Sequence, residues 1–153
     1  MKFKNIIAVL MVLIISSMAV GQDNQLKSLD DVMKALESGK YVRIVFYYKK
    51  CKLISENEEV ARVPDAIGGM TLETFEYFAE NSIGNKEAYL SASESVLIHH
   101  PSQGIVYNYA KVRIFKSGKI RLIVQYIDPK TFELKMDESF YTTIGDGAIL
   151  FAK

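Results

Sequence analysis

Cysteine is scarce in this sequence: its 153 residues include one cysteine, together with two histidines and no tryptophan. A single cysteine excludes a disulfide within the chain, and it also excludes the C-x-x-C pair of thiol redox proteins. Small exported domains often depend on disulfides because their hydrophobic cores are small. This fold must instead depend on its core, and an apolar content of 49% is sufficient to form one.

Catalytic and metal-binding motifs are also missing. The sequence contains no G-x-S-x-G elbow, no glycine-rich phosphate loop and no H-E-x-x-H pair. His99 and His100 are adjacent, so on an extended chain they point to opposite faces and do not share one metal ion. The acid pairs at 30–31 and 58–59 are typical of a helix start and of solvated surface. We therefore predict no metal and no cofactor, and the sequence gives no support for an enzyme.

Charge of one sign is not in excess. Lysine and arginine number 19 and aspartate and glutamate number 18, which gives a formal net charge of +1. The longest basic run is the short Lys49-Lys50-Cys51-Lys52. Nucleic-acid-binding domains usually carry a basic patch or stripe. We therefore predict no nucleic-acid partner and interpret this run as the solvated end of a strand.

One long hydrophobic run is present, and it lies in the first segment, MKFKNIIAVLMVLIISSMAVGQ. Two lysines precede an apolar stretch at 6–15, and Ala19 and Gly21 stand three places and one place before Gln22. This pattern predicts a secretory signal peptide at 1–21, cleaved before Gln22. The alternative is an uncleaved anchor, but the run is shorter than the roughly 20 residues that span a bilayer. After cleavage we expect a single domain at 22–153, without a membrane span, in the periplasm or outside the cell.

The first part of this domain predicts a short helix at 29–38. Ser28 is a suitable N-cap, and Asp31 suits the positive end of a helix. Gly39 follows as a stop signal. The apolar residues recur at helical spacing and form one face: Leu29, Val32, Met33 and Leu36.

The remainder of the chain predicts β-strands joined by turns. Apolar residues alternate through 41–48, and β-rich runs at 105–115 and 119–127 flank Ser117 and Gly118 as a hairpin. The other predicted elements are a loop at 52–65, turns at 99–104 and 128–131, and strands at 70–79, 88–98, 132–136 and 148–151. The predicted fold class is α+β, with one N-terminal helix packed on a mainly antiparallel sheet of six or seven strands that either lies open or closes into a barrel.

Tyrosine is the enriched residue type, with nine in the sequence. Aromatic rings with polar tips suit ligand pockets and protein interfaces, although β-propensity alone also places tyrosine in sheets. Apolar side chains occur on both faces of the strands within 41–48 and 105–127, which is more than one core-facing side requires. We hypothesise that Tyr47, Tyr107 and Tyr126 bind a small apolar ligand or the surface of a protein partner. The alternative is a compact monomer in which both faces are covered.

Cys51 follows the first predicted strand and lies among three lysines. We predict a free thiol that is at least partly accessible, in a monomeric protein. A nucleophilic role would need a base such as His99 or His100, and nothing in the spacing brings them together. The alternative is a packed or vestigial thiol. Two functions follow: an exported binding protein without a catalytic step, and a small hydrolase or redox protein that uses Cys51.

Three segments, in this order, carry a resemblance to a known family: LKSLDDVMKALESGKYVRIVFYYKKC, GKIRLIVQYIDPKTFEL and IGDGAILF. They resemble the VirK family of small exported bacterial proteins over nearly all of 22–153. The resemblance implies an association with virulence loci, and it brings no enzymatic activity or cofactor with it. It also implies a second cysteine shortly before the IGDG turn, where this chain has Tyr141, Thr142 and Thr143. Cys51 is then one half of a disulfide that this chain has lost.

The signal-peptide pattern predicts a mature protein that begins at Gln22. Signal peptidase cuts after small residues, so amino-terminal sequencing of the periplasmic or extracellular protein is expected to read from Gln22. Recovery of the chain in the membrane fraction with Met1 still present would contradict the prediction.

Overall fold

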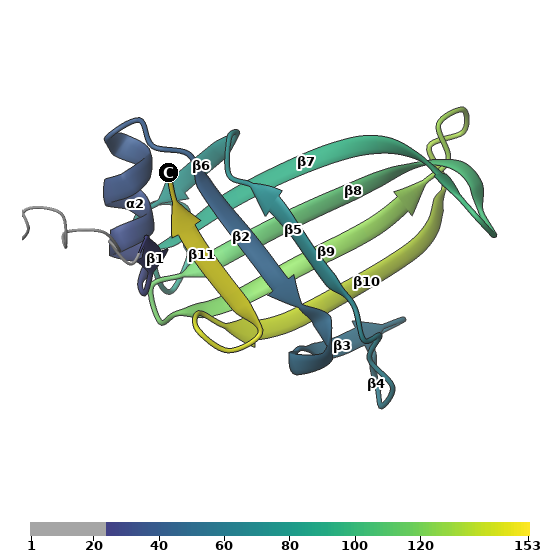
Figure 1. The fold of residues 1–153 in the computed structure, drawn as a ribbon, viewed down its shortest axis with the longest axis horizontal. Coiled ribbons are helices and arrows are strands. Elements are labelled where there is room, and N and C mark those ends of the chain that lie inside the picture. The colour runs from purple at the N-terminus through teal and green to yellow at the C-terminus, as the bar shows by residue number, and fades with distance from the viewer. Residues whose placement is uncertain (1–23) are drawn as a thin grey trace, which may run out of the picture.

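The computed structural model describes residues 24–153. The predicted signal peptide at 1–21 lies outside the described residues. One α-helix and eleven strands make up the described part, and the strands form two sheets that enclose the core, with the helix at one end (Figure 1). Within this part, no helix has both the length and the apolar character needed to cross a membrane.

Four strands form a short sheet and seven form a long sheet, and all neighbours are antiparallel. The order in the short sheet is β1 (Gln25–Leu26), β11 (Ala148–Ala152), β2 (Val42–Tyr47) and β5 (Ile67–Thr71). The order in the long sheet is β4 (Glu58–Val60), β3 (Lys52–Ser55), β10 (Leu134–Thr143), β9 (Lys119–Ile127), β8 (Gly104–Phe115), β7 (Tyr89–His100) and β6 (Phe75–Phe78). The predicted α+β class is confirmed, and the strands form two open sheets rather than a closed barrel.

The helix α2 (Leu29–Glu37) is fixed at its start by hydrogen bonds around Asp31. The Asp31 amide donates to Ser28 Oγ, and the Lys27 amide donates to the Asp31 carboxylate, each at 3.1 Å. Hydrogen bonding of the Asp31 carboxylate, first by the Ser28 side chain and then by the Lys27 amide, is the main cause that lowers the pKa of Asp31. The predicted helix and cap are therefore confirmed. Its core-facing side chains are Leu29, Val32 and Ala35, with Met33 and Leu36 partly buried beside them.

The hydrophobic core lies between the two sheets. The alternating sequence of β2 directs Val42, Ile44 and Phe46 inward, where each is almost fully buried. Burial of one large apolar side chain stabilises a fold by roughly 1.5–3 kcal/mol before entropy is subtracted. The inward side chains of the four longest strands complete this layer: Leu90, Ala92, Val112, Ile114, Ile120, Leu122 and Phe140.

The predicted loop at 52–65 is wrong, because this segment contains β3 and β4. They form a hairpin whose turn residues Glu56 and Asn57 have φ angles of 51° and 67°. Positive φ at both central residues is the geometry of a type I′ turn, whose twist matches that of a two-residue hairpin. These strands have only four and three residues and carry mostly polar side chains at the edge of the sheet. Alternation therefore cannot reveal them.

The prediction of one strand at 70–79 is also wrong. β5 ends at Thr71 and β6 begins at Phe75, and the two strands belong to different sheets. Leu72, at the crossover, is buried in the core. The turn at 99–104 is shorter than predicted, since β7 continues to His100. The described part holds eleven strands instead of six or seven because β1, β3 and β4 were not predicted and because the predicted strand at 70–79 is divided between β5 and β6.

The docking of α2 predicts that Val32→Asp destabilises the domain severely. Val32 is 0% exposed, and a carboxylate without a partner in that position would lower the free energy of unfolding by at least about 3 kcal/mol. Urea denaturation monitored by circular dichroism measures the change. Lys34→Asp places the same side chain on the exposed side of the helix, and we expect it to unfold close to the wild type. Equal unfolding midpoints for Val32→Asp and the wild type would show that the helix is not docked.

Candidate functional site

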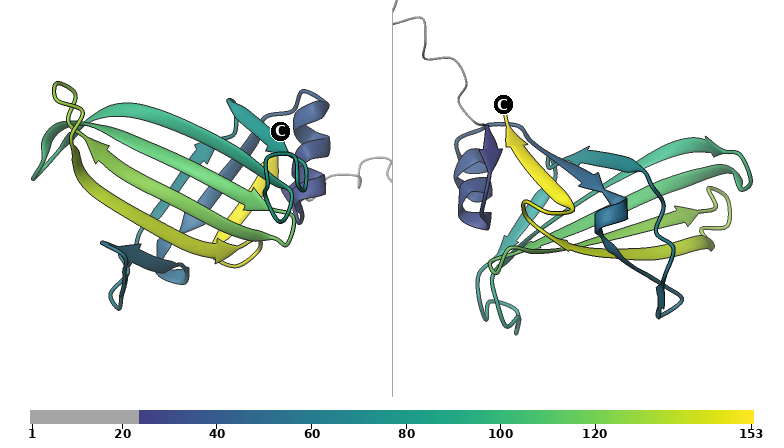
Figure 2. Two further views of the ribbon diagram at one scale, coloured as in Figure 1. Left: turned by 180° about the vertical axis from the view of Figure 1, so that it is seen from behind. Right: turned by 60° about the horizontal axis from the view of Figure 1, so that its bottom comes forward.

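The two sheets differ in strand length, and this difference leaves part of the long sheet uncovered. β7 and β8 have 12 residues each, whereas β2 has 6 and β5 has 5. β5 is an edge strand of the short sheet, and strands β7 to β10 run past it (Figure 2). The inner face of the long sheet therefore has a covered end and an open end.

We define the open end by two rows of inward-facing residues on β7, β8, β9 and β10. These rows are Glu94, Ala110, Val124 and Glu138, and next to them Val96, Asn108, Tyr126 and Met136. All of them are at least partly exposed, whereas Val112 and Leu122 at the covered end are buried. Polar side chains thus enter the inner face where the short sheet ends.

A cleft of about 180 Å³ lies between the open end and the short sheet. Most of its lining residues are apolar, but polar atoms make up more than half of the surface that they expose to the cleft, and Glu94 and Asn108 are the polar side chains that the long sheet contributes. A pocket that combines apolar side chains with a few polar groups is typical of sites for small molecules. The lining residues are Phe46, Tyr48, Gly68, Gly69 and Met70 on one side, and Glu94, Asn108, Ala110, Leu122 and Val124 on the other.

Tyr48 forms part of the cleft wall, and Gly68 makes its position possible. A Cβ atom on Gly68 would lie 2.5 Å from the Tyr48 hydroxyl oxygen, so a larger residue could not fit unless the ring moved. The Tyr48 ring also packs on Phe140, with ring centroids 4.7 Å apart. Burial is the main cause that raises the pKa of Tyr48. The hydroxyl therefore stays protonated at neutral pH and can donate a hydrogen bond.

Asn108 contributes an unpaired acceptor to the cleft. Its side-chain oxygen Oδ1 is buried and has no hydrogen-bond partner among residues 24–153. A buried polar atom without a partner costs about 1–3 kcal/mol. Native proteins keep few such atoms, and each needs a reason, such as a ligand that supplies the missing bond.

Glu94 and Glu138 stand at the two ends of the first row of the open end. Burial is the main cause that raises the pKa of each carboxyl group above its usual value. Neither carboxyl group belongs to an ion pair within the described range. The two are separated by three strand intervals, or about 14 Å. The open end therefore offers carboxylate oxygens that form no ion pair with residues 24–153.

The three tyrosines of the binding hypothesis do not lie together. Tyr126 belongs to the open end, where its ring centroid lies 4.8 Å from that of His100. Tyr107 is paired with Ile127, so it points to the outer face of the long sheet. Tyr47 lies on the outer side of the short sheet, 37% exposed, with Lys50 Nζ 5.7 Å from its ring centroid. Tyr126 alone is close to the cleft.

The residues that sequence reasoning missed are Tyr48, Glu94 and Asn108. A usable signal exists for Asn108, because it is a polar side chain at an inward position of the apolar strand GIVYNYAKVRIF. No comparable signal marks Tyr48, whose neighbour Gly68 comes from a distant strand. In the described part of the chain, no group of three His, Cys, Asp or Glu side chains is placed to hold a metal ion.

The prediction that Cys51 is partly accessible is wrong. The residue is 6% exposed, and its Sγ lies 3.5 Å from the Tyr47 carbonyl oxygen and 3.9 Å from that of Gly147. A 3-10 turn over Tyr48–Lys50 reverses the chain, so Cys51 points into the core while the lysines stay outside. Burial raises the pKa of the thiol, which disfavours the reactive thiolate.

Thr142 lies beside Cys51. The register of β3 and β10 pairs Lys52 with Tyr141, which places Cys51 opposite Thr142, and the two side chains share a hydrogen bond. Thr142 Oγ1 also accepts a hydrogen bond from the Gly147 amide at 3.0 Å. The family pattern implied by the resemblance puts its second cysteine in this segment of β10. In the structure, this segment packs against Cys51.

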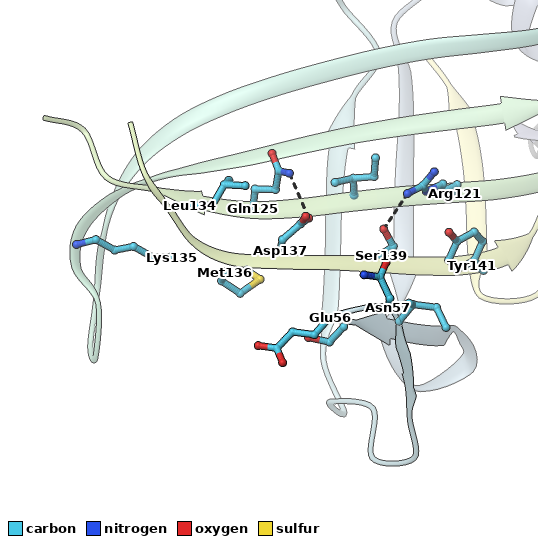
Figure 3. Close-up of a pocket in the computed structure, with 13 residues that line it drawn as sticks. Glu56, Asn57, Arg121, Gln125, Leu134, Lys135, Met136, Asp137, Ser139 and Tyr141 are labelled. Carbon is cyan, nitrogen blue, oxygen red and sulfur yellow. Dashed lines mark hydrogen bonds between the residues drawn. The ribbon is translucent and has the colours of Figure 1, made fainter. Parts of the chain in front are cut away.

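A second concave region, with a volume of about 570 Å³, lies on the outer face of the long sheet near β3, β9 and β10. Figure 3 shows two hydrogen-bonded pairs on its floor. Arg121 Nη2 donates to Ser139 Oγ at 3.3 Å, and Gln125 Nε2 donates to Asp137 Oδ1 at 3.1 Å. We call this region the outer groove, and its lining is mainly polar.

Comparisons with known proteins point to one family. A family model described as VirK protein matches residues 25–132. The chain is also similar to the crystal structure of a VirK family protein from Legionella pneumophila, with a TM-score of 0.65 and 18% sequence identity. That match covers 83% of this chain and 98% of the other, and at this identity it shows a common fold alone. A search of curated proteins gave no match.

The position of Thr142 predicts that Thr142→Cys forms a disulfide with Cys51. Directly opposed residues of antiparallel strands have Cβ atoms about 4.5–5.5 Å apart, close to the separation that a disulfide needs. Closing a loop of this length would raise the melting temperature, and reductant would reverse the gain. Thiol titration and non-reducing peptide mapping check the bond. Thr143→Cys, which points to the other face of β10, is expected to keep both thiols free. Two free thiols in oxidised Thr142→Cys would contradict the predicted geometry.

Proposed function

The chain belongs to the VirK family, and on this premise we propose that it is an exported binding protein without a catalytic step, which holds an apolar group of its ligand in the cleft between the sheets. The observation that carries this function is the buried, unpaired Asn108 Oδ1 in the lining of the cleft. It supplies one oriented acceptor in a cleft whose walls combine apolar side chains with a few polar groups, as binding sites for small ligands do.

The size of the cleft limits what it can hold. Pockets for drug-sized molecules measure roughly 300–1,000 Å³, and an apolar cavity of about 150 Å³ holds benzene. A cleft of about 180 Å³ therefore suits one aromatic ring or one apolar side chain. The ligand is a small molecule, or an exposed side chain of a protein partner, and not a large cofactor.

Two acceptors at the cleft favour a ligand that donates hydrogen bonds, while the Tyr48 hydroxyl can donate one to the ligand. Asn108 Oδ1 is an acceptor, and the Glu94 carboxyl group carries negative charge when ionised. An amine or hydroxyl group would pair with them, whereas a carboxylate would meet like charge. The preferred ligand is thus an apolar group with an amine or hydroxyl at one end.

The alternative function, a hydrolase or redox protein that uses Cys51, gains no support. The thiol is buried with a raised pKa, and the carbonyl groups of Tyr47 and Gly147 surround it instead of a base. His99 and His100 lie at the far end of β7, whereas Cys51 packs beside the start of β3. A thiol without a neighbouring base or cation is a poor nucleophile.

The proposed function also includes export from the cell and an association with virulence. Export is supported by the basic, apolar and small-residue regions of the segment at 1–21. The association with virulence rests on the family resemblance.

The function is tested by titrating the mature protein with three probes of one ring each and recording NMR spectra. Benzylamine carries a donor, toluene has no polar group, and benzoate carries an acceptor. We expect saturable shifts at Ala110 and Val124, with benzylamine bound about tenfold more tightly than benzoate, the effect of one good hydrogen bond. Absence of saturable shifts with all three probes, or tighter binding of benzoate, would contradict the proposal.

The unpaired oxygen predicts that Asn108→Leu stabilises the free protein and weakens ligand binding. The substitution removes a buried acceptor that has no partner and introduces a better strand former, so the free energy of unfolding should rise by about 1 kcal/mol. Urea denaturation and benzylamine titration measure the two effects. Tyr109→Leu, on the other face of the same strand, is expected to keep the benzylamine affinity of the wild type. A destabilised Asn108→Leu variant with unchanged affinity would refute the assigned role.

A further inference from the structure

Two arginines face each other directly on the outer face of the long sheet. The register of β8 and β9 pairs Arg113 with Arg121. The Cβ atoms of such a pair are about 4.5–5.5 Å apart, and like charges in this position destabilise a sheet. The pair sits on two central strands of the seven-stranded sheet. The repulsion between Arg113 and Arg121 destabilises the sheet unless something in their surroundings compensates for it.

Neither arginine is neutralised within residues 24–153. Both Nε atoms are buried without a hydrogen-bond partner, and neither guanidinium group belongs to an ion pair of this range. Arg121 makes one side-chain hydrogen bond, to Ser139 at 3.3 Å. Each guanidinium group has five N–H donors. The two Nε–H groups are buried, and apart from the bond to Ser139 no described side chain is hydrogen-bonded to the donors of this pair.

Each guanidinium group lies over a tyrosine ring on its own side of the pair. Arg113 Cζ is 5.4 Å from the ring centroid of Tyr89 on β7, and Arg121 Cζ is 5.5 Å from that of Tyr141 on β10. Stacking on an aromatic ring holds a guanidinium group in place without neutralising its charge. Four adjacent strands thus present two oriented positive charges between two tyrosines.

The surrounding charges reinforce the positive field of the pair. Lys111 and Lys119 lie on the same face, each two residues from one of the arginines. The carboxylates that strands bring to this side are engaged or distant: Asp137 accepts a hydrogen bond from Gln125, Glu59 pairs with Lys52, and Glu76 is two strands from Arg113. Glu56, in the turn between β3 and β4, lines the outer groove as well and is exposed to solvent. The middle of the outer face is therefore a built site for an anion.

We propose that Arg113 and Arg121 together bind a phosphate group of a molecule that lies in the outer groove. A phosphate monoester carries about −1.5 to −2 charges at pH 7, which matches two guanidinium groups. The planar arginine fork also fits phosphate with two parallel hydrogen bonds. Arg121, Ser139 and Tyr141 all line the groove, so the phosphate sits at its end and the rest of the molecule along it (Figure 3). The site is separate from the cleft and does not depend on the function proposed for it.

Arginine side-chain NMR tests the site directly. The Nε–Hε signals of the mature protein are followed while sodium phosphate is added, with sodium chloride at equal ionic strength as the reference. A second arm measures co-sedimentation with phosphatidylcholine vesicles that contain or lack phosphatidic acid. Saturable shifts with phosphate support a soluble phosphorylated ligand, and binding only to vesicles with phosphatidic acid supports a lipid headgroup. Both results support the site. The proposal is overturned if phosphate shifts the signals no more than chloride does and if vesicles with phosphatidic acid bind no more protein than vesicles without it.

Point variants distinguish a loss of phosphate binding from a loss of folding. Arg113→Gln and Arg121→Gln should each weaken the response by about tenfold or more, since charge-assisted bonds are lost. Each should also melt at a higher temperature than the wild type without phosphate, because the repulsion is relieved. Arg113→Lys keeps the charge and should weaken binding less than Arg113→Gln. Lys86→Gln, at an exposed position of another segment, is expected to match the wild type. A full response in the double glutamine variant would overturn the proposal.

Discussion

Apolar packing between two sheets of unequal length is the constraint on which the rest of this structure depends. The short sheet and α2 bury one end of the long sheet, where Ile44, Phe46 and Leu122 meet in the core. The chain has no internal disulfide to assist this packing. Because β7 and β8 extend beyond β5 (Figure 1), the two rows of the open end are only partly covered, although Val106, further along β8, is buried.

The distribution of polar groups follows from this geometry. At the covered end the inward side chains are apolar. Cys51 packs among them in the core, and this packing is sufficient to explain its burial. At the open end the same strands carry Asn108, whose Oδ1 has no hydrogen-bond partner within the described residues, and Glu94 and Glu138, which form no ion pair there. On the outer face, Arg113 and Arg121 carry the opposite charge. The long sheet therefore presents acceptors on one side and donors on the other.

Local signals in the sequence predicted the fold class, but pairing between distant segments determined the sites. Ser28 and the apolar spacing predicted α2, and Ser117-Gly118 predicted the hairpin of β8 and β9, because both depend on neighbouring residues. The sequence pattern predicted one strand at 70–79, where the structure has the end of β5 and all of β6. Only tertiary packing assigns these two strands to different sheets. Tyr107 and Tyr126 lie on opposite faces because the register of the β8–β9 hairpin pairs Tyr126 with Asn108 rather than with Tyr107. The resemblance supplied the family, which the comparisons confirm.

The central claim is that the cleft beside β5 receives an apolar group. Intermolecular nuclear Overhauser effects between the ring protons of bound benzylamine and the methyl groups of the mature protein test it most directly, because they report contacts within a few ångströms. We predict effects to the methyl groups of Met70, Ala110 and Val124, which line the cleft. Effects confined to the exposed side chains of Leu97 and Ile105 on the outer face would contradict the claim.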